Sequence, residues 1–185
     1  MSRFEYLSVL ISIAIALGIS EMISSWGALL CQRHQVRFYW VHSVWTLFLF
    51  LLMIQFWWGF WNFRLIEHWS FGALVAIVSE VVVLVLAGIV LGPRPDSSGT
   101  IDLRLHYFEQ SRVFFLLGIV LLVQLALVDT LVGDQPFLHP ENAVRALGFG
   151  VGVLGAFSQN ERVHQVMALG SLVLLVAFVS VALGR

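Results

Sequence analysis

The sequence contains no lysine, a single cysteine and few charged residues of either sign. All ten basic residues are arginines, eleven residues are acidic, and these two groups make up 11% of the 185 residues, with a net charge of −1. This balance leaves no basic face for nucleic acid. Cys31 has no partner for an internal disulfide, and no Cys-x-x-Cys or Cys/His metal spacing exists. These shortages exclude a nucleic-acid-binding domain, an internally disulfide-bonded domain and a cysteine-based metal site.

Apolar residues dominate what remains. They make up 59% of the chain, and the mean hydropathy is +0.92. A soluble domain is about half apolar and about a quarter charged. The longest polar stretch, residues 93–106, is too short to fold as a soluble domain of its own. We therefore predict an integral membrane protein whose main partner is the lipid bilayer.

Six apolar segments of helical length follow one another along the chain. We expect helices at residues 4–30, 38–63, 71–92, 107–132, 141–157 and 163–183. This pattern predicts an all-α, polytopic transmembrane helical bundle that forms one domain over residues 1–185. Ser20, Glu21 and Met22 form no small-residue cleavage site, so we expect the first segment to stay as a helix.

Two segments of the sequence are less regular than the others. Residues 102–109 alternate charged and apolar side chains, which favours a short interfacial helix leading into the fourth crossing. The fifth segment is short, because only residues 146–157 follow Arg145 without a charge. Gly148 and Gly152 are spaced four apart, as in tight helix crossings. The fifth segment is thus either a short crossing packed through these glycines or a broken, re-entrant helix beside a cavity.

Glu80 lies near the middle of the third segment. A charge at that depth is costly, so we expect Glu80 to face protein or water. Ala73 and Ala76 share its helix face and would let a neighbouring helix approach closely. Glu80 is either a proton or cation site, with a pKa raised by desolvation, or a structural carboxyl bonded to a neighbouring helix. Gln55, Gln124 and serines are the candidate partners for the structural role.

The first segment carries a second set of polar residues. Ser8 and Ser12 lie on a stripe that continues from Glu5. Glu21 projects to a different side of the same helix, and we expect it to be buried toward the end of that helix. The predicted ion or solute pathway consists of Glu80, Glu21, Gln55, Gln124, Ser8 and Ser12.

No pattern in the sequence indicates an enzyme. There is no Ser-His-Asp order, phosphate-binding loop or paired-carboxylate spacing. His34, His42, His106 and His164 map to one end of the predicted bundle, and histidines on facing helices can bind haem. They lie at helix entries and in turns, and no Cys-x-x-Cys-His is present. We therefore expect no metal and no cofactor, with haem as a lower-ranked alternative.

Most of the chain takes part in one resemblance. Its residues are Phe4, Glu5, Tyr6, Gln55, Phe56, Trp57, Trp58, Pro93, Asp96, Asp102, Leu103, Arg104, Tyr107 and Arg112. On these residues the chain resembles a bacterial family of uncharacterised six-helix membrane proteins. The resemblance implies a multi-pass protein of the bacterial inner (plasma) membrane and implies no activity.

The first segment carries a second, narrower resemblance. Its residues are Arg3 to Ser8, Ile13 to Leu17, and Glu21. On them the segment is similar to the first helix of bacterial leak potassium channels related to the lysosomal one. Leu7, Ser8 and Val9 stand where those channels have Phe-Ser-Asp. This resemblance implies a six-helix subunit that assembles around a pore lined by its first helix.

These observations lead to one functional hypothesis and two alternatives. The first is conduction of a proton or small cation, or binding of a small solute, at the buried carboxylates. The second is a non-catalytic scaffold or accessory subunit of a larger membrane complex, docked through the glycine face of the fifth segment and the alanine face of the third. The third is a haem-binding electron carrier. We expect the chain to act as a homo-oligomer or as a subunit of a membrane complex.

Overall fold

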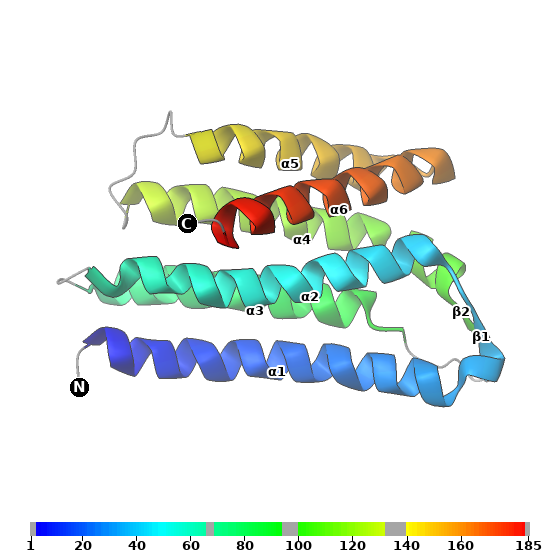
Figure 1. The fold of residues 1–185 in the computed structure, drawn as a ribbon, viewed down its shortest axis with the longest axis horizontal. Helices are drawn as coiled ribbons and strands as arrows, with labels where there is room; N and C mark the ends of the chain where they lie inside the picture. Colours follow the sequence, from blue (N-terminus) through cyan, green and yellow to red (C-terminus); the bar gives the residue numbers. More distant parts are fainter. Residues whose placement is uncertain (1–2, 66–68, 94–99, 132–139, 184–185) are drawn as a thin grey trace.

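A computed structural model describes residues 3–65, 69–93, 100–131 and 140–183, and these residues form six α-helices (Figure 1). The helices are α1 (Arg3–Cys31), α2 (Trp40–Phe60), α3 (Phe71–Leu91), α4 (Leu103–Leu131), α5 (Pro140–Phe157) and α6 (Glu161–Leu183). Short 3₁₀ helices, η1 (Arg33–Gln35) and η2 (Trp61–Leu65), follow α1 and α2. The predicted all-α fold is confirmed.

Within the described residues, four helices are long and apolar enough to cross a bilayer. Their apolar stretches are Phe4–Cys31, Trp40–Phe60, Phe71–Leu91 and Leu103–Val128, and the third has the highest mean hydropathy, 2.9. At about 1.5 Å per residue, α3 is roughly 32 Å long, close to the thickness of about 30 Å of a bilayer core. Length and composition therefore indicate a multi-pass membrane protein.

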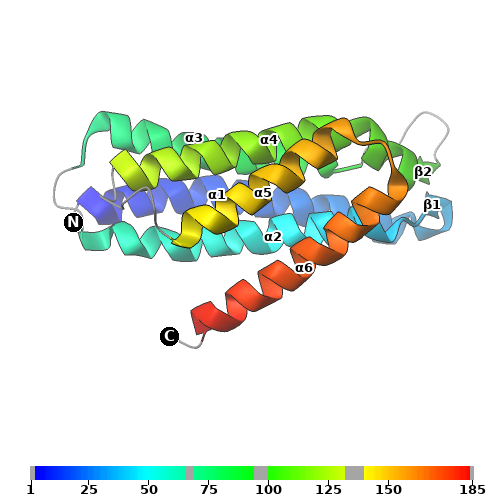
Figure 2. The ribbon, with the colours of Figure 1, turned by 90° about the horizontal axis from the view of Figure 1, so that it is seen from above.

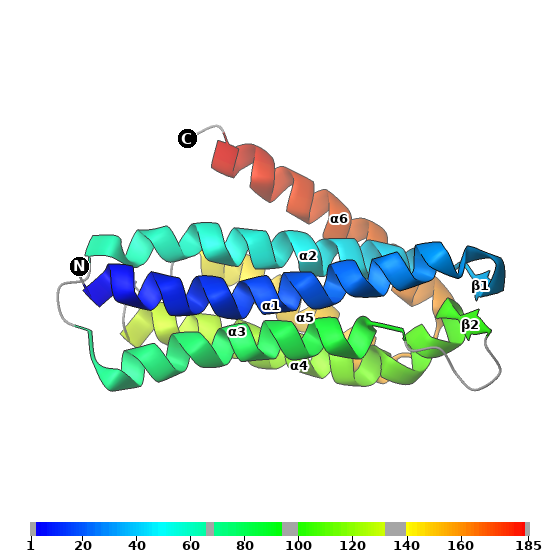
Figure 3. The same ribbon diagram turned by 90° about the horizontal axis from the view of Figure 1, so that it is seen from below.

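The first four helices form a bundle, and α5 and α6 cover one side of it (Figure 1). α3 packs against both α1 and α4, α2 packs against α1, and α5 lies along α4. α6 contacts α2 and then diverges from the bundle toward its C-terminal end, as Figures 2 and 3 show. The start of α1 and the end of α6 point toward the same end of the bundle (Figure 1).

A short parallel strand pair joins the two helical hairpins at the opposite end. β1 (Val36–Arg37) precedes α2, β2 (Ile101–Asp102) precedes α4, and Val36 pairs with Ile101. Each strand leads into a helix that runs back through the bundle, so the pair sets the starts of α2 and α4 side by side. We did not predict this pair, because two residues are too few to show a strand period.

α4 begins at Leu103, so the separate interfacial helix expected at residues 102–109 is wrong. Asp102 explains the earlier start. Its Oδ1 accepts hydrogen bonds from the backbone N–H groups of Arg104 (3.1 Å) and Leu105 (3.0 Å). These bonds satisfy donors of the first helical turn, as an N-cap residue does. The charged residues that follow are simply the first turns of α4.

Glycines bring α5 onto α4. A Cβ added at Gly152 would lie 2.7 Å from Ile119 Cγ1, and one at Gly148 would lie 3.2 Å from Leu122 Cδ1. A Cβ added at Gly155 would lie 2.5 Å from the ring of Phe115. Within a bilayer such close backbone approach, rather than water exclusion, stabilises helix pairs. The described α5 is one uninterrupted helix of 18 residues.

Candidate functional site

A cavity of about 360 Å³ lies between α3 and α4. Its lining residues are Ser70, Gly72, Ala73, Ala76, Ser79, Gln124, Leu127 and Val128. Ser70 is the N-cap of α3, and its side chain accepts a hydrogen bond from the backbone of Ala73 (3.1 Å). Ser79 lies about 13 Å further along the same helix axis. The cavity therefore extends from the start of α3 to near the middle of this span.

Small residues on α3 open this cavity. Gly72, Ala73 and Ala76 face α4 but leave space that Leu127 and Val128 do not fill. The sequence predicted that the two alanines would support close helix packing. The structure places both alanines at the packed α3–α4 boundary, where they also form part of the wall of the cavity.

The inner end of the cavity is polar. Gln124 Nε2 donates to Ser79 Oγ (3.0 Å), and Ser79 Oγ donates to the carbonyl oxygen of Ala76 (2.6 Å). Gln124 Oε1 is buried and accepts no hydrogen bond from the described residues. Leaving a buried acceptor unsatisfied costs about 1–3 kcal/mol. A water molecule or ligand donor in the cavity would remove that cost.

Glu80 follows Ser79 in the chain and lies on the inner face of α3. It is 2% exposed and shares that face with Ile77 and Leu84, each 1% exposed. As expected from the sequence, Glu80 faces protein. Gln55, the other predicted polar partner, is half-buried on α2. The structure thus brings Gln124 and Ser79 together at the depth of Glu80, and the importance of Ser79 was not predicted.

The pathway residues predicted on α1 serve other roles. Ser8 Oγ donates to the carbonyl oxygen of Glu5 in its own helix (2.8 Å). Ser12 Oγ accepts a hydrogen bond from Trp57 Nε1 (3.0 Å), which links α1 to α2. Glu21 is exposed on the outside of α1, so its predicted burial is wrong. Glu21 and Glu80 therefore do not share one site.

The histidines considered as haem ligands bind helix ends instead. His42 Nε2 donates to the carbonyl oxygen of Leu91 (2.8 Å), the last residue of α3. His164 Nε2 donates to the carbonyl oxygen of Ser158 (2.9 Å), just after α5. His164 Nδ1 shares a hydrogen bond with the hydroxyl of Tyr107 (2.8 Å). Both ring nitrogens of His164 are thereby used by the protein itself.

No group of three histidine, cysteine, aspartate or glutamate side chains is placed to hold a metal in the part of the chain that the structure describes. The ring centroids of His42 and His106 are 6.0 Å apart in an edge-on arrangement. This histidine pair joins the starts of α2 and α4. In this part of the molecule, the geometry supports a structural role for the histidines.

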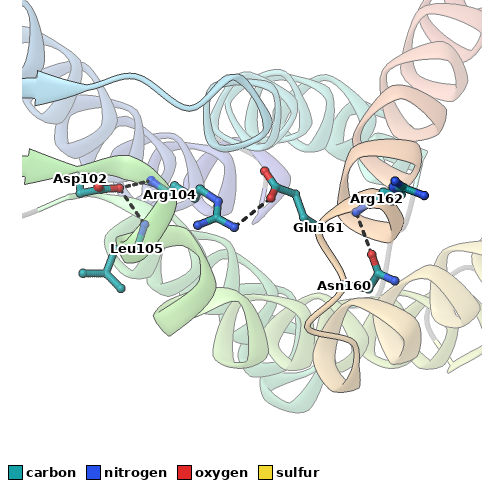
Figure 4. A network of polar contacts seen from close by, with 6 residues as sticks. All are labelled: Asp102, Arg104, Leu105, Asn160, Glu161 and Arg162. Atoms are coloured by element: carbon teal, nitrogen blue, oxygen red, sulfur yellow. Dashed lines mark hydrogen bonds and ion pairs between the residues drawn. The ribbon is translucent and has the colours of Figure 1, made fainter.

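A polar network fixes the starts of α4 and α6, as Figure 4 shows. Arg104, in the first turn of α4, donates through Nη2 to Glu161 Oε2 (2.9 Å), the first residue of α6. Asn160 Oδ1 accepts from the backbone N–H of Arg162 (3.0 Å) and so caps α6. Together with the Tyr107–His164 hydrogen bond, this network holds the start of α6 to the bundle.

Two titratable groups next to this network have shifted pKa values. Hydrogen bonds from the backbone, first from Leu105, hold the pKa of Asp102 below its usual value, and Arg37 (3.5 Å away) acts in the same direction. Burial raises the pKa of Tyr39 to about 12, and the negative charge of Glu161 adds to this shift. At neutral pH, Asp102 is therefore ionised and Tyr39 is a neutral phenol.

Comparison of the chain with protein-family models, with curated proteins and with solved structures gives no match. The two resemblances seen in the sequence therefore stay predictions. The cavity and the polar groups at its inner end are the features that bear on function.

Proposed function

We propose that this protein binds a small polar solute or cation, or passes a proton or small cation, at the polar groups around Glu80 within the membrane. The observation that carries the proposal is the cavity between α3 and α4. It reaches the hydrogen-bonded pair of Ser79 and Gln124, next to Glu80. Ionisable residues inside membrane helices are rare and usually mark ion, proton or substrate pathways.

The size and chemistry of the cavity suit a small ligand. A volume near 360 Å³ is at the lower end of the range of roughly 300–1,000 Å³ for small-molecule sites. Amide and carboxylate oxygens are ligands of hard cations. A carboxyl group can also take up and release a proton, whereas Ser79 and Gln124 can only exchange hydrogen bonds. Glu80 is therefore the group on which ion or proton passage depends.

We expect a solute to reach the site from the end of the bundle at which α3 starts. The cavity starts beside Ser70, at the first turn of α3. Beyond Glu80, the inner face of α3 continues with Leu84, Ala87 and Leu91, which are buried and apolar. Binding is thus supported directly by the geometry, and passage to the other end requires a rearrangement that opens this apolar segment. Alternating opening around a site near the midplane is a common transport principle.

A flux assay on Glu80 tests the proposal. In proteoliposomes we expect wild-type protein to carry protons, sodium or potassium above the rate of empty liposomes. Glu80→Gln keeps the shape and hydrogen bonding of the side chain but cannot ionise. We therefore expect this variant to fold and its ion-dependent flux to fall at least tenfold. Glu109→Gln, an exposed carboxylate on α4, is the matched control and should keep the wild-type rate.

The binding part of the proposal is tested in the same samples by thermal stability. A cation bound only by the folded protein raises the free energy of unfolding by about 2.7 kcal/mol when its concentration is 100 times its Kd. The melting temperature rises as a result. Ala76→Leu should abolish that shift, because the larger side chain fills the cavity. Wild-type protein with neither flux nor cation-dependent stabilisation would contradict the proposal.

A second candidate function, a subunit of a larger membrane complex, is favoured by one observation. Glu21 is exposed on the outside of an otherwise apolar helix. A carboxylate facing lipid is unfavourable, so this surface suits contact with another protein chain. Isolation of the native protein from gently solubilised membranes, followed by mass determination, would distinguish a single chain from an assembly.

A further inference from the structure

Glu21 is a carboxylate on the outer surface of α1. Ser20, the residue before Glu21, and Ser24, nearly one turn further on, are also exposed. Among the described residues, the carboxylate of Glu21 forms no hydrogen bond or ion pair. An isolated charge facing hydrocarbon costs several kcal/mol, so this position calls for a polar neighbour from outside the chain.

The packing of α1 against α3 gives the depth of Glu21. Gly88 lies beside Met22, and Gly18 lies beside Val85, so α1 and α3 run in parallel and in register. Glu21 is therefore level with Gly88. Gly88 is about 10 Å along the axis from Val81, at the middle of α3. Half of a bilayer core is about 15 Å, which leaves Glu21 inside the hydrocarbon layer.

Arg112 is exposed on α4 at a matching depth. Glu21 lies about 15 Å from the end of α1 and Arg112 about 14 Å from the start of α4, measured along each helix. These two helix ends lie at the same end of the bundle (Figure 1). The guanidinium of Arg112 lies over the ring of Phe157, 5.6 Å from its centroid, and forms no ion pair with any described residue.

The two charges belong to different surfaces of one molecule. α1 contacts α2 and α3, whereas α4 contacts α3 on one side and α5 on another. Glu21 and Arg112 therefore lie on separate outer faces with opposite charge at similar depth. In a low dielectric such charges attract strongly, and each relieves the cost of exposing the other to lipid.

We propose that the α1 surface around Glu21 binds the α4 surface around Arg112 of a second copy of this chain. The contact joins two different surfaces, so each copy of a pair keeps its other surface free for a further copy. Such head-to-tail contacts build a ring when the rotation between copies closes, and an open chain when it does not. Ser20 and Ser24 keep the α1 side of the contact narrow, which allows the helices to approach.

Charge reversal with mixing tests this contact. We expect wild-type protein in lipid nanodiscs or mild detergent to have the mass of an oligomer by light scattering. Glu21→Arg and Arg112→Glu should each give monomers, because each variant places like charges at every junction between its own copies. When the two variants alternate in an assembly, every junction pairs opposite charges. We therefore expect an equimolar mixture to form the oligomer again. The double variant should also assemble.

The controls separate assembly from folding. Arg162→Glu, a reversal at an exposed arginine of α6, should leave the oligomer unchanged. Circular dichroism should show equal helix content in all variants, and the mixing result depends only on the chains that pass this check. A monomeric wild type, single reversals that still assemble, or a mixture of folded variants that stays monomeric would each overturn the proposal. The measured mass is independent of flux, so the two proposals fail separately.

Discussion

Two carboxylates, Glu21 and Glu80, show what single residues reveal in a membrane helix. Both interrupt apolar segments, and the sequence predicted both to be buried. The structure buries Glu80 at 2% exposure and leaves Glu21 exposed. In a bilayer, lipid-facing and protein-facing side chains are equally apolar, so the pattern along a helix does not mark which face meets a neighbour. The burial of Glu80 could be inferred from its central position in the segment. The outward direction of Glu21 could be known only from how α1 packs on its neighbours.

Asp102 supports a prediction at this scale. Its carboxylate caps α4, so Asp102→Ala should lower stability by about 1 kcal/mol, whereas Asp102→Asn keeps an oxygen acceptor and should lose less. The lowered pKa of Asp102 means that its stabilising effect is present above the unfolded-state pKa and is lost as the pH falls through the folded-state pKa. Melting temperatures measured from pH 7 to pH 3 should therefore fall more steeply for wild type than for Asp102→Asn. Parallel curves would show that the carboxylate does not carry this effect.

Helices were the elements best predicted from the sequence. Long apolar runs and the Gly92–Pro93 stop placed all six, and their ends differ from the prediction by a few residues. The start of α4 was misplaced because the alternating charged and apolar residues at 102–109 were taken as a separate helix, and the capping role of Asp102 was missed. The β1–β2 pair and the cavity were not predictable, since both arise where segments distant in the chain meet. The four-residue spacing of Gly148 and Gly152 did indicate the side of α5 that meets α4.

The glycines of α5 support a prediction at the element scale. Gly155→Leu should destabilise the protein by about 1–3 kcal/mol, because the new side chain must displace the ring of Phe115, which is buried against Trp45. Gly150→Leu is the matched control, since nothing lies within 4 Å of its added Cβ. Thermal unfolding in one detergent compares the two variants. Equal losses would mean that α5 does not pack on α4 through this face.

At the scale of the whole molecule, the described residues differ between the two ends of the bundle. The cavity starts beside Ser70, near the end toward which the start of α1 and the end of α6 point. At the other end, the β1–β2 pair, the Arg104–Glu161 ion pair and the Tyr107–His164 hydrogen bond tie the helices together. This asymmetry predicts that a solute enters from the side of the termini, and that loosening the held end is the step that would complete passage.

The most direct test of this account is the accessibility of Ser79 from each side of the membrane. In a Cys31→Ser background, Ser79→Cys in oriented vesicles is treated with a small, membrane-impermeant, cationic thiol reagent. We predict that it reacts from the side of the termini and at least tenfold more slowly from the other side, while Leu84→Cys, on the buried apolar segment, reacts from neither. A Ser79→Cys variant that is inert from both sides, or that reacts equally from both, would contradict a cavity that leads from one end of the bundle to Ser79 and Gln124.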